Sequence, residues 1–93
     1  MNQGEKFFAD ELEKLLAMPL ETKQDLQAWQ SASKQLRDRI RSDYPDIGYE
    51  GDTYHFLVDA EIRQRDAGYR RWQEEQVRGY IRQVRSQHEH DVV

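Results

Sequence analysis

The 93-residue sequence contains no cysteine, which excludes disulfide bonds, thiolate metal sites and cysteine nucleophiles. Proline occurs only at Pro19 and Pro45, and each is expected to end the regular segment that precedes it. No run of 18 apolar residues is present, and the first residues lack the basic start and apolar run of a secretion signal. We therefore expect a cytoplasmic protein without a membrane-spanning segment.

The composition is polar for a globular protein, with 37% hydrophobic and 34% charged residues and a mean hydropathy of -1.09. Five tyrosines, three phenylalanines and two tryptophans nevertheless argue against disorder. A chain of this length forms one domain with a thin core, and such helical domains often complete the burial of an apolar face by pairing. We expect a single domain over residues 1–93 that forms a homodimer or binds a different protein.

The net charge of -4 is unevenly distributed along the chain. Residues 1–61 carry 7 basic and 13 acidic groups, whereas residues 62–87 carry 7 arginines and only 3 acidic groups. Such halves attract each other, either within one chain or across a dimer. The acidic balance also disfavours general attraction to nucleic acid.

Two helices are predicted in the first half of the chain, at about residues 4–17 and 22–42. Thr22 followed by Asp25 resembles a capping arrangement at the start of the second helix. Apolar residues then recur at spacings of three and four, with Ser33 in the middle of the seam. This serine either admits a close approach by another helix or leaves a gap. The same seam predicts that Trp29 and Leu36 face the next helix in a shared core.

A third, long helix is predicted at about residues 52–87, which contain no proline. Counting 100° per residue gathers an apolar stripe on one side and places Arg63 with other arginines on the opposite side, while Arg65 falls within the stripe. The stripe consists of Tyr54, Val58, Ile62, Tyr69, Trp72, Tyr80 and Val84. The bulky run at residues 53–58 also suits a strand. Four acids that each precede an arginine by four residues favour the helix.

The sequence thus predicts an all-α fold, a three-helix bundle with a long third helix. Gly68 is the expected site of a kink or break, in which case Asp66 caps a fourth helix and the chain forms a four-helix domain. An unbroken third helix of 36 residues reaches about 54 Å, so Tyr80 and Val84 are expected to project and to be covered by a second copy. Residues 88–93 are predicted to be frayed.

No arrangement of residues indicates catalysis, a metal or a cofactor. His55 precedes Asp59 by four residues, but no third group is placed to complete an acid–base site. The acidic loop at residues 43–52 lacks the order of a calcium-binding loop. His88 and His90 lie in the tail, at a spacing that suits one helical face poorly. We expect that the protein is not an enzyme and binds no cofactor.

Two binding surfaces are predicted. The protein-interface residues are Tyr49, Tyr54, Tyr69, Trp72, Tyr80 and Val84, because large amphipathic side chains dominate interfaces when they are partly buried. The alternative surface is an anion or nucleic-acid contact formed by Arg71, Arg78, Arg82 and Arg85. The leading hypothesis is a small intracellular interaction module that binds and regulates or neutralises another protein. The second is a nucleic-acid-binding regulator that uses the arginine face.

Overall fold

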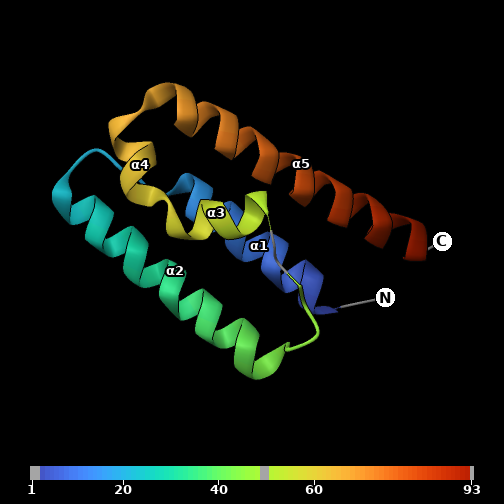
Figure 1. The fold of residues 1–93 in the computed structure, drawn as a ribbon. Coiled ribbons are helices and arrows are strands. Elements are labelled where there is room, and N and C mark those ends of the chain that lie inside the picture. Colours follow the sequence, from blue (N-terminus) through green and yellow to red (C-terminus); the bar gives the residue numbers. More distant parts are fainter. Residues whose placement is uncertain (1–2, 49–50, 93) are drawn as a thin grey trace.

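The computed structural model describes residues 3–48 and 51–92, apart from the side chains of Asp52 and of residues 88–92. Five helices make up almost all of this part of the chain, and it contains no strand (Figure 1). They are α1 (Gln3–Ala17), α2 (Lys23–Asp43), α3 (Asp52–Val58), α4 (Ala60–Arg65) and α5 (Ala67–Val92). The predicted all-α fold is confirmed, and residues 53–58 are helical. None of these helices is long and apolar enough to cross a membrane.

The first two helices begin and end close to the predicted boundaries. At the start of α2, the Thr22 hydroxyl accepts a hydrogen bond from the Asp25 N–H at 3.0 Å, and the Asp25 carboxylate accepts one from the Thr22 N–H at 3.0 Å. This reciprocal arrangement satisfies two backbone donors that a helix start leaves without partners. The predicted capping arrangement is therefore confirmed.

The long third helix is the part of the prediction that the structure corrects. The backbone leaves the α-helical path at Asp59 and again at Asp66, so the predicted helix over residues 52–87 becomes α3, α4 and α5. Gly68 is not the break and lies inside the first turn of α5. Asp66 is the cap instead, because its carboxylate accepts a hydrogen bond from the Tyr69 N–H at 3.0 Å. The predicted frayed tail also differs, because α5 continues to Val92.

The break at Asp59 allows the chain to fold back on itself. In Figure 1, α5 runs beside α1, while α2 lies on the other side of the bundle and α3 and α4 cross between them. The Ser33 hydroxyl of α2 is buried and donates a hydrogen bond of 2.7 Å to the Leu57 carbonyl of α3. Ser33 thus admits the close approach of another helix, the first of the two alternatives for this position.

The core joins all five helices. Trp29 and Leu36 are buried, and Trp29 packs on the segment predicted as the third helix, with its ring 5.2 Å from that of Phe56 in α3 and 4.4 Å from the guanidinium of Arg63 in α4. Its indole N–H also donates to the Leu15 carbonyl of α1 at 3.0 Å. The buried hydrophobic residues are Phe8, Ala9, Leu12, Leu15, Leu20, Trp29, Leu36, Ile40, Ile47, Phe56, Leu57, Ala60, Val77, Ile81 and Val84.

The fold-back also changes the expected position of the end of the stripe. Val84 is only 3% exposed and Tyr80 is half-buried, with its ring 6.1 Å from that of Phe8 in α1. These two residues therefore do not project beyond the bundle. Because α5 lies along α1, the first helix of the same chain covers the part of the stripe that was expected to need a second copy.

We expect Leu36→Ala to lower the free energy of unfolding by about 2–5 kcal/mol, because it leaves a cavity where a buried side chain joins α2 to α1. Chemical denaturation measures this difference. The neighbouring, exposed Gln35 is the matched control, and Gln35→Ala should change the stability by less than about 0.5 kcal/mol. Equal effects of the two variants would contradict this packing.

Candidate functional site

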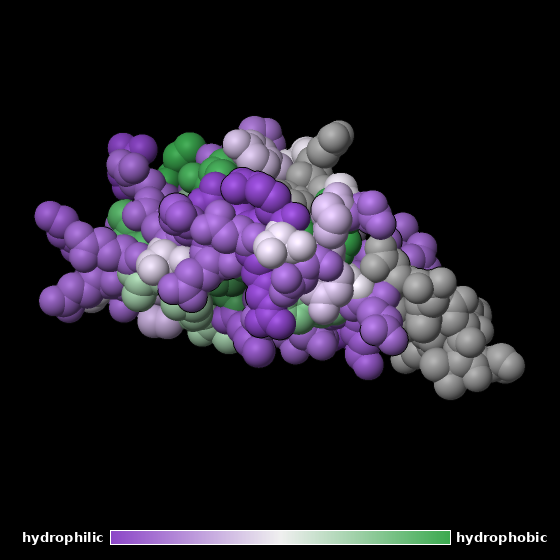
Figure 2. All heavy atoms as spheres, turned by 90° about the horizontal axis from the view of Figure 1, so that it is seen from below, coloured by the Kyte–Doolittle hydropathy of each residue, from purple (hydrophilic) through white to green (hydrophobic). Residues whose placement is uncertain are grey.

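Four large hydrophobic side chains are exposed in the described part of the chain, and all of them come from residues 54–72. We call them the apolar patch: Tyr54 (46% exposed), Val58 (37%), Ile62 (40%) and Trp72 (50%). The first three recur every four residues along α3 and α4, and Trp72 lies in the second turn of α5. Figure 2, seen from the side of α2, shows a mostly hydrophilic surface with its largest hydrophobic group at one edge. All the exposed large hydrophobic side chains of the described residues thus belong to one segment of the chain.

Polar contacts hold the two parts of the apolar patch together. The Tyr69 hydroxyl of α5 donates to the Asp59 carboxylate at 2.8 Å, and that carboxylate also lies 3.6 Å from Nδ1 of His55 in α3. The Tyr69 ring lies 6.0 Å from the Trp72 ring at an interplanar angle of 31°. The start of α5 is thereby held against the junction between α3 and α4, and Trp72 lies next to the Tyr69 ring that makes this contact.

Beneath this surface lies a buried arginine that the sequence did not reveal. Arg63 is 1% exposed, and its guanidinium lies between the rings of Trp29 and Phe56, at 4.4 and 4.3 Å from the ring centroids. Its Nη1 donates hydrogen bonds of 2.6 Å to the Phe56 carbonyl and to the side-chain oxygen of Gln73. Its Nε and Nη2 are buried without a hydrogen-bond partner among the described residues. Arg63 therefore links four helices.

Burial lowers the pKa of Arg63 to about 10, while the nearby carboxylates of Glu74 and Asp59 partly offset this effect. The guanidinium thus stays charged at neutral pH. The network continues outward, because the Gln73 amide donates to the Tyr69 hydroxyl at 3.0 Å, which in turn donates to Asp59. Burial, followed by the hydrogen bond to Asp59, raises the pKa of Tyr69. A chain of hydrogen bonds therefore connects the buried guanidinium of Arg63 with Asp59, the residue that follows Val58 of the apolar patch.

The structure places the predicted interface residues in different environments. Tyr54 and Trp72 are exposed, Tyr69 is half-buried next to Trp72, and Tyr49 lies outside the described residues. Tyr80 and Val84 pack within the chain, so Val84 is not available on the surface. Two patch residues, Val58 and Ile62, were recognised as part of the stripe but not as interface residues. The spacing of Val58 and Ile62 identified them as stripe residues. Whether they are exposed depends on the way in which the chain folds back, which the spacing does not show.

Three of the four arginines in the predicted anion-contact row pair with carboxylates of the same chain. Arg85 contacts Glu13 at 2.7 Å and Asp10 at 3.1 Å, joining α5 to α1. Arg82 contacts Glu75 at 3.1 Å, and Arg78 lies 3.6 Å from Glu74. Only Arg71 of this row has no carboxylate within reach in the described chain. The expected attraction between the acidic and basic halves thus occurs within one bundle.

The Arg85 guanidinium holds the pKa of the Glu13 carboxyl below its ordinary value of 4.5. This contribution to stability is present above that value and is lost as the pH falls through the lower pKa of the folded state. Arg78, Arg82 and Arg85 also line a depression of about 390 Å³ between α1 and α5. Because Glu13 lies in the same lining, an incoming anion must compete with a carboxylate that is already there.

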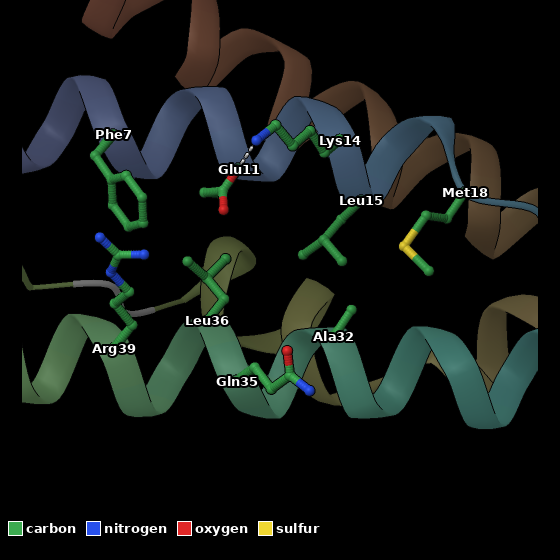
Figure 3. Close-up of a pocket in the computed structure, with 9 residues that line it drawn as sticks. All are labelled: Phe7, Glu11, Lys14, Leu15, Met18, Ala32, Gln35, Leu36 and Arg39. Atoms are coloured by element: carbon green, nitrogen blue, oxygen red, sulfur yellow. Dashed lines mark ion pairs between the residues drawn. The ribbon is translucent and has the colours of Figure 1, made fainter.

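A second concave surface lies between α1 and α2, with a volume of about 300 Å³ (Figure 3). Its side chains point toward one another across the gap, with Phe7 and Leu15 on α1 and Leu36 and Arg39 on α2. The charged groups at its rim are already engaged, because Arg39 contacts both the Phe7 ring and Asp43, and Lys14 pairs with Glu11. The groove therefore leaves few charged groups available to a ligand, and it is a weaker candidate for a binding surface than the apolar patch.

We expect Gln73→Leu to lower the free energy of unfolding by about 1.5–3 kcal/mol, because it removes an acceptor from a buried charged donor. Gln76→Leu, at an exposed position of the same helix, is the control and should have little effect. Thermal or chemical denaturation of both variants tests this. An equally stable Gln73→Leu protein would show that the Arg63 network does not stabilise the fold.

The side chains that the structure describes include no group of three or more histidine, aspartate or glutamate residues that could hold a metal ion. The arrangement at His55, Asp59 and Tyr69 is a hydrogen-bonded surface network in which each group already has a partner. Comparison of the chain with known protein families, with curated proteins and with solved structures finds no match.

Proposed function

We propose that this chain is a small protein-interaction module, that it binds and regulates another polypeptide, and that the apolar patch is its binding surface. The observation that carries the proposal is the concentration of every exposed large hydrophobic side chain of the described residues within residues 54–72. Single exposed apolar residues are ordinary, whereas a group of them at one place is typical of an interaction site. Catalysis has no part in this proposal.

The composition of the apolar patch supports binding to protein. Tryptophan and tyrosine contribute strongly to interfaces, because they bury a large apolar area and still offer a polar atom. The Trp72 ring lies against that of Tyr69, and Tyr69 is hydrogen-bonded to Asp59, which reduces the freedom that Trp72 loses on binding. A surface that is fixed before contact binds more tightly than a mobile one of the same area.

The alternative of nucleic-acid binding through the arginine row has less support. Phosphate backbones are bound by cations that can release their counterions, but Arg78, Arg82 and Arg85 already have carboxylate partners. The exposed aromatic side chains, on which bases stack, belong to the apolar patch and not to the row.

Photo-crosslinking in native extract tests the proposal. A crosslinking amino acid in place of Ile62 is expected to give one discrete adduct, because Ile62 is an exposed member of the apolar patch. The same amino acid in place of Ser31, an exposed residue of α2, is the matched control and should give no adduct of that mass. The adduct should also be reduced by Trp72→Ala. Identical products from both positions would contradict a binding surface at the patch.

A further inference from the structure

The charged residues around the apolar patch differ from those elsewhere on the last two helices. Of the arginines in α4 and α5, one is buried and four have a carboxylate within 4.0 Å; the four are Arg70, Arg78, Arg82 and Arg85. The remaining two are Arg65 and Arg71, which are exposed and have no carboxylate partner in the described chain. Glu61 is likewise exposed and without a cationic partner there.

These three unpaired charges are next to patch residues. Glu61 precedes Ile62 directly, Arg71 precedes Trp72 directly, and Arg65 follows Ile62 within one turn of α4. Elsewhere on α5 the chain satisfies its own arginines, so charges without partners at the edge of an exposed apolar surface are the expected rim of an interface. The occupant must then offer an apolar centre with both a cation and an anion beside it.

We propose that this occupant is a second copy of the same chain, which packs its own apolar patch against the first about a twofold axis, with Glu61 of each chain facing Arg65 and Arg71 of the other. The inference rests on the part of the proposed function that makes the apolar patch a binding surface, and it names a second copy as the polypeptide bound there. In a twofold interface residue i meets residue j while j meets i, so a patch with both signs of charge at its rim can be its own complement. Each chain then supplies the arginines that the Glu61 of its neighbour lacks.

The second copy is favoured over a nucleic acid or a membrane by the same residues. A phosphate-rich surface, whether of nucleic acid or of a membrane, would satisfy Arg65 and Arg71 but would repel Glu61. A partner copy satisfies both charges and covers the apolar side chains together. Opposite charges at the rim also fix the orientation in which the two copies pack.

Sedimentation equilibrium of the purified chain tests the proposal first. The expected mass at micromolar concentrations is about twice the 11.2 kDa of one chain. Trp72→Ala should weaken the association at least about tenfold, because a large aromatic anchor is lost at the centre of the interface. Lys23→Glu, a charge reversal at an exposed residue at the start of α2, is the control and should leave the mass unchanged. Circular dichroism verifies that each variant is folded.

Charge reversal tests the arrangement of the two copies. The single variant Glu61→Arg and the double variant Arg65→Glu/Arg71→Glu each place like charges opposite one another, so each alone should associate at least about tenfold more weakly. A mixture of the two variants restores opposite charges at both contacts and should form a mixed dimer. Native mass spectrometry of the mixture distinguishes the mixed dimer from the two homodimers. Because all three positions are exposed, the variants should fold normally.

A strict monomer, or a dimer that Trp72→Ala leaves intact, would overturn the proposal. A mixture of the charge variants that does not associate would overturn the twofold arrangement. Either of these results would leave the proposed function untouched, because the two proposals can fail independently. If the purified chain is a monomer while the crosslinker at Ile62 still captures a single different protein, the patch is a binding surface but its partner is not a second copy.

Discussion

The buried guanidinium of Arg63 is the contact at which four of the five helices meet. It lies between the rings of Trp29 and Phe56 and donates to a carbonyl of α3 and to Gln73 of α5. A buried charge is costly unless it is hydrogen-bonded, and aromatic faces on both sides compensate part of that cost. Because α4 places this side chain where α2, α3 and α5 meet, Arg63 contacts all three of those helices, and only its Nη1 is hydrogen-bonded among the described residues.

The same interaction explains how a single helical stretch becomes three helices. A helix end leaves its last carbonyls without intrahelical donors. At the end of α3, the Phe56 carbonyl accepts from Arg63 and the Leu57 carbonyl accepts from the Ser33 hydroxyl of α2. Side chains thus take over hydrogen bonds that a continuous helix would make with its own backbone. The break costs little for this reason, and α5 can return along α1.

The fold-back also decides which apolar residues are covered. The stripe of α5 beyond Tyr80 packs on α1, where Arg85 adds exposed ion pairs to Asp10 and Glu13. Ion pairs of this kind contribute only modestly to stability. The stripe residues of α3 and α4, and Trp72 in the second turn of α5, receive no such cover. The apolar patch is therefore the part of the stripe that the bundle does not need for its own core.

The sequence by itself determined the all-α fold, the capped start of α2, the seam with Trp29 and Leu36, and the attraction between an acidic front and an arginine-rich segment. These features depend on local spacing, on capping side chains and on net charge, which are properties of neighbouring residues. Asp66 was also identified as a cap, although the break was assigned to Gly68.

Only the tertiary structure decided where the last half of the chain turns and what each part of its stripe contacts. Arg63 was placed on the polar side because the periodicity assumed one continuous helix, and a turn at Asp59 changes the face on which every later residue lies. Val84 became a core residue and Ile62 a surface residue for the same reason. Periodicity identifies which residues share a face, but contacts between distant segments determine whether that face is covered.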